Sequence, residues 1–467
     1  MDTLAQQLLR EPVLVRFFAA LSLLAAFDAT VIYAQDTYVS SQIIVRLKDD
    51  PARASPTEAL DPRFYELSRP LIPALNLYLV HLKTGLSVQQ ALTSLRSNPR
   101  IKYAQPDHRL TWREGREGRE PRIPNDPDYS KLWNMTKISA PDAWALGTGG
   151  KDKLNNEVVI AIVDGGMDLQ HPELIDNLWI NRAEIAGNGI DDDGNGYVDD
   201  VYGWNAYAHN GIIPSASHGT HVAGIAGARG NNANGIAGVN WDVKIMPVAA
   251  SSGTTSVVAE GYGYVLTQKK LWLETHGAKG ANVVATNSSF GVDYADCQSS
   301  DYPVWNDLYD EMGKVGILSA AATANLDLDI DKSGDVPTSC KSDYLITVTN
   351  TDDQDQLSSS AGYGLTSIDL GAPGENIFSL VPVSEGLTGV KTGTSMATPH
   401  VTGAIGLLHS LASADFARAA QADPAGSALK LKTAILSSVD PLPSLQGKTV
   451  SGGRLNLIKA ARALGAR

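Results

Sequence analysis

An unbroken run of β-branched and small apolar residues, from Val158 to Val163, constrains the fold of this chain more than any other segment. Runs of this kind are typical of strands that are buried on both faces, as in parallel sheets covered by helices. The run ends in Asp164 and two glycines. Because open α/β sheets gather their active groups at the carboxyl ends of strands, the segment predicts an α/β fold with a functional carboxylate at Asp164.

Two further stretches of small residues carry candidate catalytic side chains. The sequence SHGTHVAGIAG places His218 at the start of an expected helix, where an imidazole can act as a base near neutral pH. The sequence TGTSMATPHVTG predicts a tight loop that enters a buried helix, with Ser395 in its first turn. Unpaired N–H groups at a helix start favour developing negative charge. Taken alone, a serine there is more commonly an N-cap, so the interpretation depends on the three stretches together.

The motifs AIVDGGMDLQHPEL, SHGTHVAGIAG and GTSMATPHVTG resemble those of the subtilisin-like serine proteases, or subtilases. That family has its catalytic residues in the chain order Asp, His, Ser, and Asp164, His218 and Ser395 follow that order here. The similarity runs from about Trp133 to the C-terminus. It implies a doubly wound α/β domain with a mostly parallel sheet, which hydrolyses peptide bonds through an acyl-enzyme.

The resemblance also assigns residues around the reacting bond. Asn325 is the expected oxyanion-hole amide, although Thr323 and Ala324 stand where the family pattern has a glycine. The alternative role for Asn325 is that of an ordinary turn residue. A second segment resembles the family's N-x-S-x-G stretch, whose backbone pairs with an extended substrate. The substrate-binding residues expected from it are Asn287, Ser289, Phe290 and Gly291.

The sequence predicts four successive segments. Residues 1–34 resemble a signal peptide, because two arginines precede an apolar run that is too short to span a bilayer; an ordinary N-terminal helix or a disordered end is the alternative. Residues 35–110 show the pattern of a small α/β, ferredoxin-like unit and resemble the inhibitory prodomain of subtilases. Residues 111–124 predict an exposed linker with the maturation site, or else a permanent domain linker. Residues 125–467 form the expected catalytic domain.

An acidic loop at residues 187–200 predicts a calcium site. Its D-x-D-x-N-G spacing matches the first half of an EF-hand loop, in which oxygen ligands alternate along the chain. The twelfth position is Tyr202 instead of Glu, so Asp199 or Asp200 is expected to supply the further carboxylate. The predicted ligands are Asp191, Asp193, Asn195 and Asp199. The alternative is a solvated acidic turn. A second acidic run, residues 327–335, fits a strand edge or a loop as well as a metal site.

Composition limits the partners and the location. The net charge of −13 argues against nucleic acid, and no other stretch is apolar and long enough for a membrane anchor once the signal is removed. Cys297 and Cys340 are an even pair in an exported chain and predict one disulfide, with two free thiols as the alternative.

We therefore expect a secreted, extracellular or periplasmic endopeptidase that is monomeric and is made as a self-processing precursor. It acts on proteins or peptides, binds its own prodomain and structural Ca²⁺, and uses no organic cofactor. Two competing hypotheses are a non-catalytic binding protein that keeps the fold and a calcium-binding adhesin or structural module.

Overall fold

The computed structural model describes residues 38–48, 59–83, 85–108 and 120–467, and the chain divides into two compact units after Gly115. The expected signal peptide and residues 111–119 of the expected linker lie outside the described residues. Within the described ranges, no helix combines the length and the apolar character that a membrane crossing requires.

The N-terminal unit is a four-stranded antiparallel sheet with a helix packed against it. Its strands are β1 (Tyr38–Leu47), β2 (Tyr65–Ile72), β3 (Leu77–Leu82) and β4 (Ile101–His108), in the spatial order β2-β3-β1-β4. Helix α2 (Val88–Arg96) begins where Ser87 and Gln90 form a capping box, and its apolar face lies in the core of this unit. The ferredoxin-like α/β unit is confirmed. The sequence did not predict β2, because Pro70 and a register shift interrupt its alternation.

The C-terminal unit is built on a nine-stranded, mostly parallel sheet. In spatial order its strands are β16 (Asp440–Pro441), β17 (Gly453–Arg454), β13 (Leu370–Pro373), β12 (Leu345–Thr351), β10 (Leu318–Ala322), β8 (Val283–Ser288), β5 (Val159–Asp164), β7 (Lys244–Ala249) and β6 (Trp204–Asn205). The edge strand β16 pairs antiparallel with β17, and the other pairs are parallel. The order reverses beside β5, which has β7 on one side and β8 on the other. Ligands of open α/β sheets bind at such a reversal.

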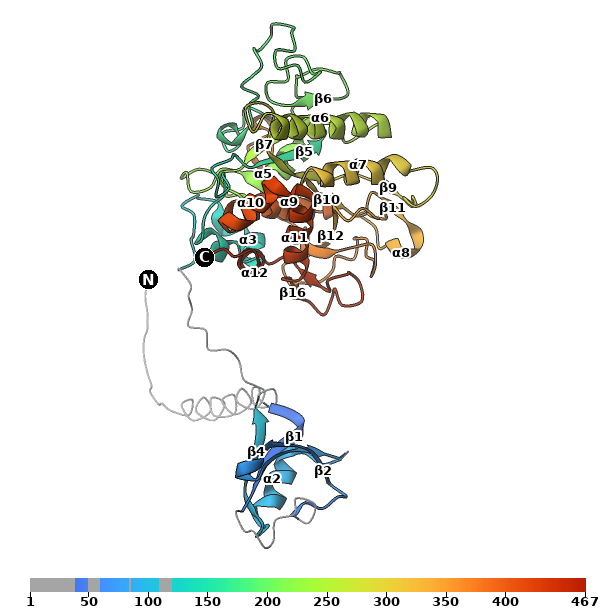
Figure 1. Ribbon diagram of the computed structural model, residues 1–467. Helices are drawn as coiled ribbons and strands as arrows, with labels where there is room; N and C mark the ends of the chain where they lie inside the picture. The colour runs from blue at the N-terminus through green and yellow to red at the C-terminus, as the bar shows by residue number, and fades with distance from the viewer. Residues whose placement is uncertain (1–37, 49–58, 84, 109–119) are drawn as a thin grey trace, which may run out of the picture. The chain divides into compact units, whose positions relative to one another are not determined.

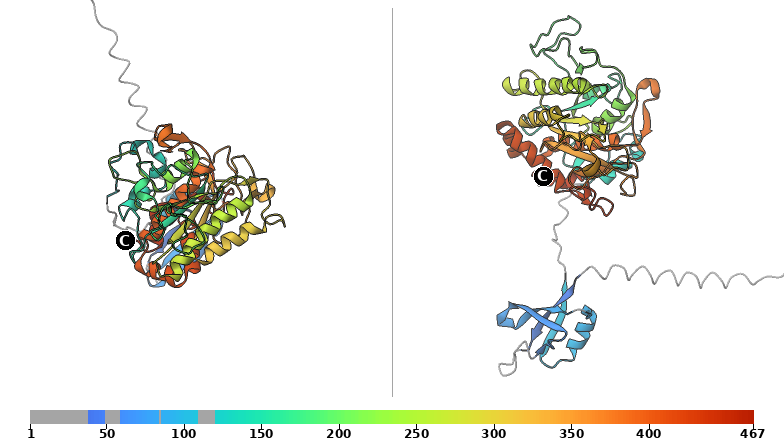
Figure 2. Two further views of the ribbon diagram at one scale, coloured as in Figure 1. Left: turned by 90° about the horizontal axis from the view of Figure 1, so that it is seen from above. Right: turned by 90° about the vertical axis from the view of Figure 1, so that its right-hand side faces the viewer.

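Helices cover both faces of this sheet (Figures 1 and 2). On one face α5 (Ser217–Gly227) packs against α9 (Thr394–Leu411), and on the other lie α6 (Thr255–Glu274) and α7 (Pro303–Lys314). The core of the first face also receives α3 (Trp133–Lys137), α4 (Ala140–Trp144), α10 (Ala414–Ala422), α11 (Pro424–Leu436) and α12 (Leu457–Ala463).

Strand β5 contributes to both cores because its side chains alternate across the sheet. Ile160 and Ile162 lie in the core with α5 and α9, whereas Val159, Ala161 and Val163 lie in the core with α6 and α7. Apolar residues at every position of β5 follow from this double burial. The predicted doubly wound α/β fold is confirmed.

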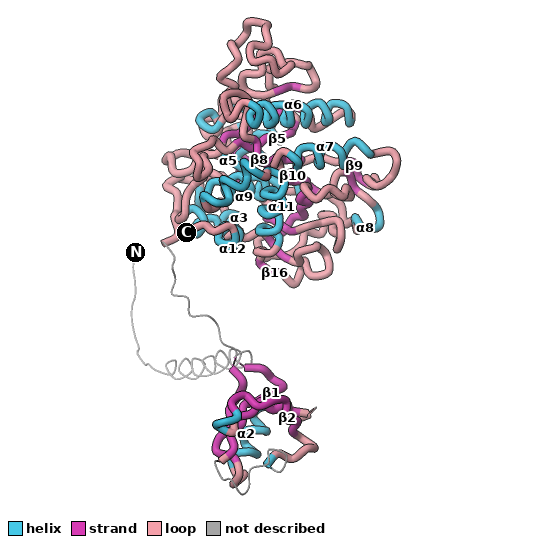
Figure 3. The backbone as a smooth tube through the Cα atoms, viewed as in Figure 1, coloured by secondary structure: helices cyan, strands magenta, loops and turns pink. Residues whose placement is uncertain are grey.

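Short ribbons and loops complete the unit. Strand β9 (Val292–Asp293) pairs antiparallel with β11 (Asp335–Val336), which follows α8 (Ile330–Ser333) in the chain. Strand β14 (Ile377–Leu380) pairs antiparallel with β15 (Thr388–Lys391). Cys297 and Cys340 follow β9 and β11 and are joined by a disulfide across a Cα–Cα distance of 4.9 Å. The predicted disulfide is confirmed. Figure 3 shows that the segment between β5 and α5 is mostly loop.

Candidate active site

Asp164 and His218 form a hydrogen-bonded pair at the carboxyl end of the parallel sheet. Asp164 is the last residue of β5 and is 2% exposed, and His218 is the second residue of α5. The Nδ1 atom of His218 lies 2.8 Å from Oδ2 of Asp164 and 3.0 Å from Oδ1. The backbone N–H of Gly165 donates to Oδ1 at 2.7 Å. The His218 side chain is 42% exposed, so a buried carboxylate anchors a ring that solvent can reach.

Gly219 allows the start of α5 to approach the end of β5. A Cβ atom at this position would lie 1.9 Å from the carbonyl oxygen of Gly166 and 3.1 Å from Oδ1 of Asp164. Any larger residue would therefore push the helix start, and His218 with it, away from Asp164. This steric limit explains why a glycine follows the histidine in the SHGTH motif.

Ser395 lies in the first turn of α9, beside the chain that leaves β8. Its hydroxyl donates to the carbonyl of Ser289 at 3.3 Å, and the hydroxyl of Ser289 donates to the carbonyl of Ser395 at 3.0 Å. Within the described part of the chain, Ser395 makes no hydrogen bond to His218. The structure thus joins Asp164 and His218 directly, and places the start of the serine helix against the expected substrate segment.

Asn325 lies beside the start of α9. Its Oδ1 accepts the backbone N–H of Thr394 at 2.9 Å. Because only the amide oxygen can accept this hydrogen bond, the orientation of the side-chain amide is fixed and Nδ2 remains as a donor. Asn325 and Ser395 line the same cavity, which has a volume of about 110 Å³. Asn325 and the serine that would attack a substrate carbonyl therefore border one space.

The four residues expected to bind substrate divide into two groups. Ser289, Phe290 and Gly291 line the cavity that Ser395 borders. Asn287 is fully buried behind them; its Nδ2 donates to the hydroxyl of Ser289 at 2.9 Å, and its Oδ1 accepts the hydroxyl of Thr402 at 3.0 Å. Asn287 thus holds Ser289 in place from the interior.

Comparison with known proteins identifies the family. The Subtilase family matches residues 155–453, which is more than half of the chain and contains Asp164, His218 and Ser395. The chain belongs to the subtilase family. Subtilases are serine peptidases, so the chain is a peptide hydrolase by family. The fervidolysin N-terminal prodomain matches residues 26–107, so this subtilase carries a prodomain of that kind.

Individual relatives agree with this assignment. Thermitase from Thermoactinomyces vulgaris is 31% identical over 347 residues, which cover 72% of this chain and 99% of thermitase. Subtilisin-like protease 1 from Plasmodium berghei (strain Anka) is 27% identical over 363 residues, and this subtilase spans about half (54%) of its length. A solved protease structure from Pseudoalteromonas arctica PAMC 21717 covers 73% of this chain and 99% of that chain, with a TM-score of 0.52; at 22% identity it supports the fold alone.

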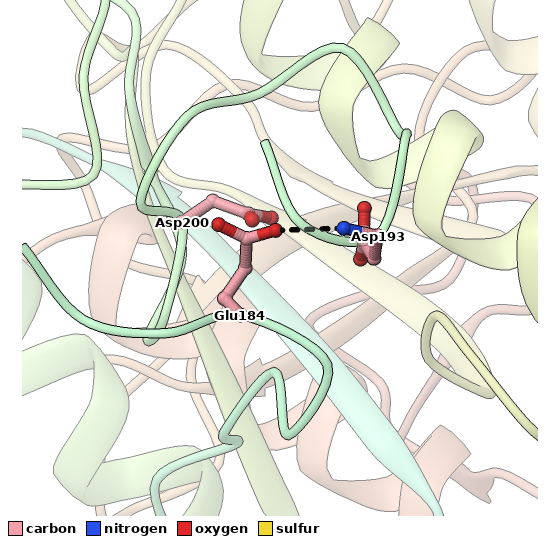
Figure 4. Close-up of side chains that lie close together, drawn as sticks. All are labelled: Glu184, Asp193 and Asp200. Carbon is pink, nitrogen blue, oxygen red and sulfur yellow. Dashed lines mark hydrogen bonds between the residues drawn. The ribbon is translucent and has the colours of Figure 1, made fainter. Parts of the chain in front are cut away.

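Three buried carboxylates of this subtilase come together beside the acidic loop (Figure 4). Glu184, Asp193 and Asp200 each offer an oxygen within 4.8 Å of the other two. Burial, together with the negative charge of Asp193, raises the pKa of Asp200 to about 7. Carboxylates at this separation repel one another strongly in a buried site. Burial removes these three carboxylates from solvent, and an all-oxygen donor set suits Ca²⁺.

The predicted calcium ligands have different positions in the loop. Asp193 belongs to the group of three carboxylates, and the side-chain amide of Asn195 donates to both Asp193 and Asp200. The carboxylate of Asp191 instead accepts backbone N–H groups at residues 194–196, and that of Asp199 accepts those at residues 188 and 189. Asp191 and Asp199 therefore shape the loop.

Glu184 was not found from the sequence. It precedes the EF-hand-like spacing, and its oxygens accept the backbone N–H groups of Asp192, Asp193 and Asp199. A glutamate shortly before an acidic run is the sequence feature that could have suggested Glu184. Its inward orientation depends on the fold of the loop, which residue spacing does not encode.

Proposed function

We propose that this subtilase is a secreted serine endopeptidase that uses Asp164, His218 and Ser395 as its catalytic triad. The observation that carries the proposal is the hydrogen bond between the buried Asp164, at the carboxyl end of β5, and His218 of α5. Helix α5 packs against α9, which carries Ser395. The cavity shared by Ser395 and Asn325 supports the same function.

Each residue has a distinct role in the proposed reaction. Asp164 holds Nδ1–H of His218, which leaves Nε2 as the proton acceptor. The Ser395 hydroxyl turns from Ser289 toward the imidazole when a substrate carbonyl enters, since catalytic hydrogen bonds are often formed only in the substrate complex. The serine oxygen attacks the carbonyl carbon, and its proton passes to His218.

The negative oxygen that forms is held by the backbone N–H of Ser395 and by Nδ2 of Asn325, an interaction worth about 3 kcal/mol for one donor. His218 then donates its proton to the departing amine. Water hydrolyses the resulting ester by the reverse sequence of proton transfers. The substrate backbone pairs with residues 289–291, whose chain borders the cavity.

A fluorogenic peptide assay tests this function. The wild-type protein is expected to release the fluorophore, and Ser395→Ala to lower turnover by about 10⁴-fold or more. A matched control is Ser360→Ala, which removes a hydroxyl in a surface loop. Equal turnover by wild type and Ser395→Ala would exclude the peptidase and favour a non-catalytic binding protein.

We further propose that the chain is exported, that the prodomain inhibits the catalytic domain and assists its folding, and that the subtilase cuts itself between residues 110 and 124. The signal-peptide pattern of residues 1–34 and the match to a fervidolysin prodomain support this proposal. In that case Ser395→Ala accumulates as the uncleaved precursor, whereas normal processing of the variant would point to another protease. The mature enzyme is proposed to be a monomer, which its mass in solution would test.

We also propose that Glu184, Asp193 and Asp200 hold a structural calcium ion. Three buried carboxylates with mutually close oxygens support the site, because charges in the interior need a counter-charge. The ion would supply that charge and tie Glu184 to the loop at residues 187–200.

A further inference from the structure

The cavity beside Ser395 is lined by two acidic residues. It is bordered by the nucleophile, by Asn325, and by three segments of chain, residues 289–291, 322–325 and 394–395. In addition, Asp293 of β9 and Asp335 of β11 line it. Among the described residues that line the cavity, these two are the charged ones.

The two carboxylates lie opposite each other across one strand pair. Asp335 and Asp293 are register partners in the β9–β11 ribbon, where side chains of like charge destabilise the pairing. Asp335 is 1% exposed and Asp293 is exposed, so the Asp335 carboxylate lies in the interior and the Asp293 carboxylate lies toward solvent. Close packing keeps them beside the cavity: a Cβ atom on Gly291 would lie 2.6 Å from the carbonyl oxygen of Val336 and 3.4 Å from Oδ1 of Asp335.

The buried carboxylate of Asp335 accepts a hydrogen bond, and within the part of the chain that the structure describes it forms no ion pair. The hydroxyl of Thr338 donates to Asp335, and the charge of Asp293 adds repulsion. A buried carboxylate is costly unless a positive charge compensates it. None of the described residues that line the cavity is cationic, so a positive charge that pairs with Asp335 there would have to come from a bound molecule.

We propose that this subtilase prefers a basic residue, Arg or Lys, on the acyl side of the bond that it cleaves, and that Asp335 and Asp293 select it. The inference rests on the proposed peptidase function. A carbonyl carbon held between Ser395 and Asn325 directs the side chain of its own residue into the adjoining cavity. There a guanidinium or ammonium group donates charge-assisted hydrogen bonds to Asp335 in the interior and to Asp293 near solvent.

The sequence of the linker supports this preference independently. The segment in which self-cleavage is expected, residues 110–124, contains four arginines: Arg113, Arg116, Arg119 and Arg122. Arg122 is held by the catalytic unit, since its backbone N–H donates to Pro141 and its guanidinium lies 4.9 Å from the Trp241 ring. We therefore expect the mature N-terminus to follow Arg113, Arg116 or Arg119.

The preference should weaken in acid. Burial, together with the nearby charge of Asp293, raises the pKa of Asp335 from 3.8 to about 6. Above pH 6 the carboxylate is charged and attracts a basic side chain; as the pH falls through about 6 it becomes neutral and the attraction is lost. The ratio of cleavage rates for basic and neutral substrates, measured on one enzyme, isolates this change from any titration that affects both substrates.

The test compares kcat/KM for matched fluorogenic peptides that differ in one residue before the cleaved bond: Arg, Lys, Met or Glu. We expect Arg and Lys to exceed Met by about tenfold or more, and Glu to be the poorest. Asp335→Asn should lower the Arg/Met ratio at least about tenfold, and Asp293→Asn should lower it less and in a salt-dependent way. Asp296→Asn, an equal charge change on the same segment outside the cavity, should leave the ratio unchanged.

The outcomes separate this inference from the proposed function. Turnover of none of the peptides by the mature wild-type enzyme would overturn the peptidase itself. Met cleaved as fast as Arg, or an Arg/Met ratio untouched by both Asp293→Asn and Asp335→Asn, would overturn the preference and leave the peptidase in place. If Asp335→Asn fails to fold, the exposed Asp293→Asn variant still decides. N-terminal sequencing of the mature protein should find a cut after an arginine, and a cut after a neutral residue would count against the preference.

Discussion

Both carboxylate oxygens of Asp164 lie within hydrogen-bonding distance of His218 Nδ1, Oδ2 at 2.8 Å and Oδ1 at 3.0 Å, and Oδ1 also accepts the N–H of Gly165 at 2.7 Å. In Asp164→Asn the amide oxygen would stay with the N–H of Gly165, and the NH₂ group would face His218. The NH₂ group would donate to Nδ1 of His218, so the ring proton would lie on Nε2. Nε2 could then no longer accept the proton of Ser395. We predict that kcat falls by about 10⁴-fold while KM changes little, measured with a fluorogenic peptide. An unchanged kcat would contradict the triad, and Asp152→Asn in a loop of the same domain serves as control.

Removing the disulfide should lower stability. Cys297 and Cys340 are 43 residues apart, and closing a loop of that length stabilises a fold by about 4 kcal/mol. We predict a loss of about 3–4 kcal/mol in Cys297→Ala/Cys340→Ala, measured by denaturant unfolding in the Ser395→Ala background so that self-digestion does not intervene. Reductant should destabilise the parent protein by a similar amount and leave the double variant unchanged. A parent protein that is indifferent to reductant would refute this.

Calcium removal should destabilise the catalytic unit. Binding to the native state raises stability by about 2.7 kcal/mol when the ion is at 100 times its Kd, so chelation should lower Tm. Asp200→Asn keeps the shape of the side chain and removes a charge from the group formed with Glu184 and Asp193. We expect the Tm of this variant to respond much less to calcium, whereas Asp176→Asn outside the acidic loop should behave like wild type. A Tm that chelation does not change would remove the site.

Lys269 should make stability depend on pH. It is 5% exposed, donates to Asn282 at 2.6 Å, and burial lowers its pKa from 10.5 to about 7. Below pH 7 both folded and unfolded chains carry the proton. Between pH 7 and 10.5 the unfolded chain binds more protons than the folded one, so this group makes stability rise with pH.

The variant Lys269→Met lacks that rise. We predict that the stability of wild type relative to Lys269→Met increases by a few kcal/mol, on the order of 1.4 per pH unit at most, between pH 7 and 10. Lys270→Met, whose parent side chain is 46% exposed, is the matched control and should show no such change. Both are compared by urea unfolding in the Ser395→Ala background. A constant difference across this pH range would show that Lys269 keeps an ordinary pKa.

Much of the candidate active site could be predicted from the sequence because each part of it is encoded locally. The apolar run before Asp164 specifies a buried strand, and the small residues around His218 and Ser395 specify helix starts that can approach the sheet closely. The steric demand at Gly219 shows why: the motif records a contact that any Cβ atom would prevent. The capping box at Ser87 is local in the same way.

The rest was decided by tertiary structure. Glu184 joins Asp193 and Asp200 because a loop without a recognisable pattern folds back on the acidic run. Asp335 meets Asp293 because two-residue strands far apart in the chain pair beside the cavity, a pairing too short to have a periodicity. The sequence by itself determined the family, the doubly wound sheet and the residue types at the carboxyl end of β5, since these follow from burial patterns and short motifs. Which carboxylates share a site depended on long-range packing, because electrostatic proximity is a property of the folded chain and not of residue spacing.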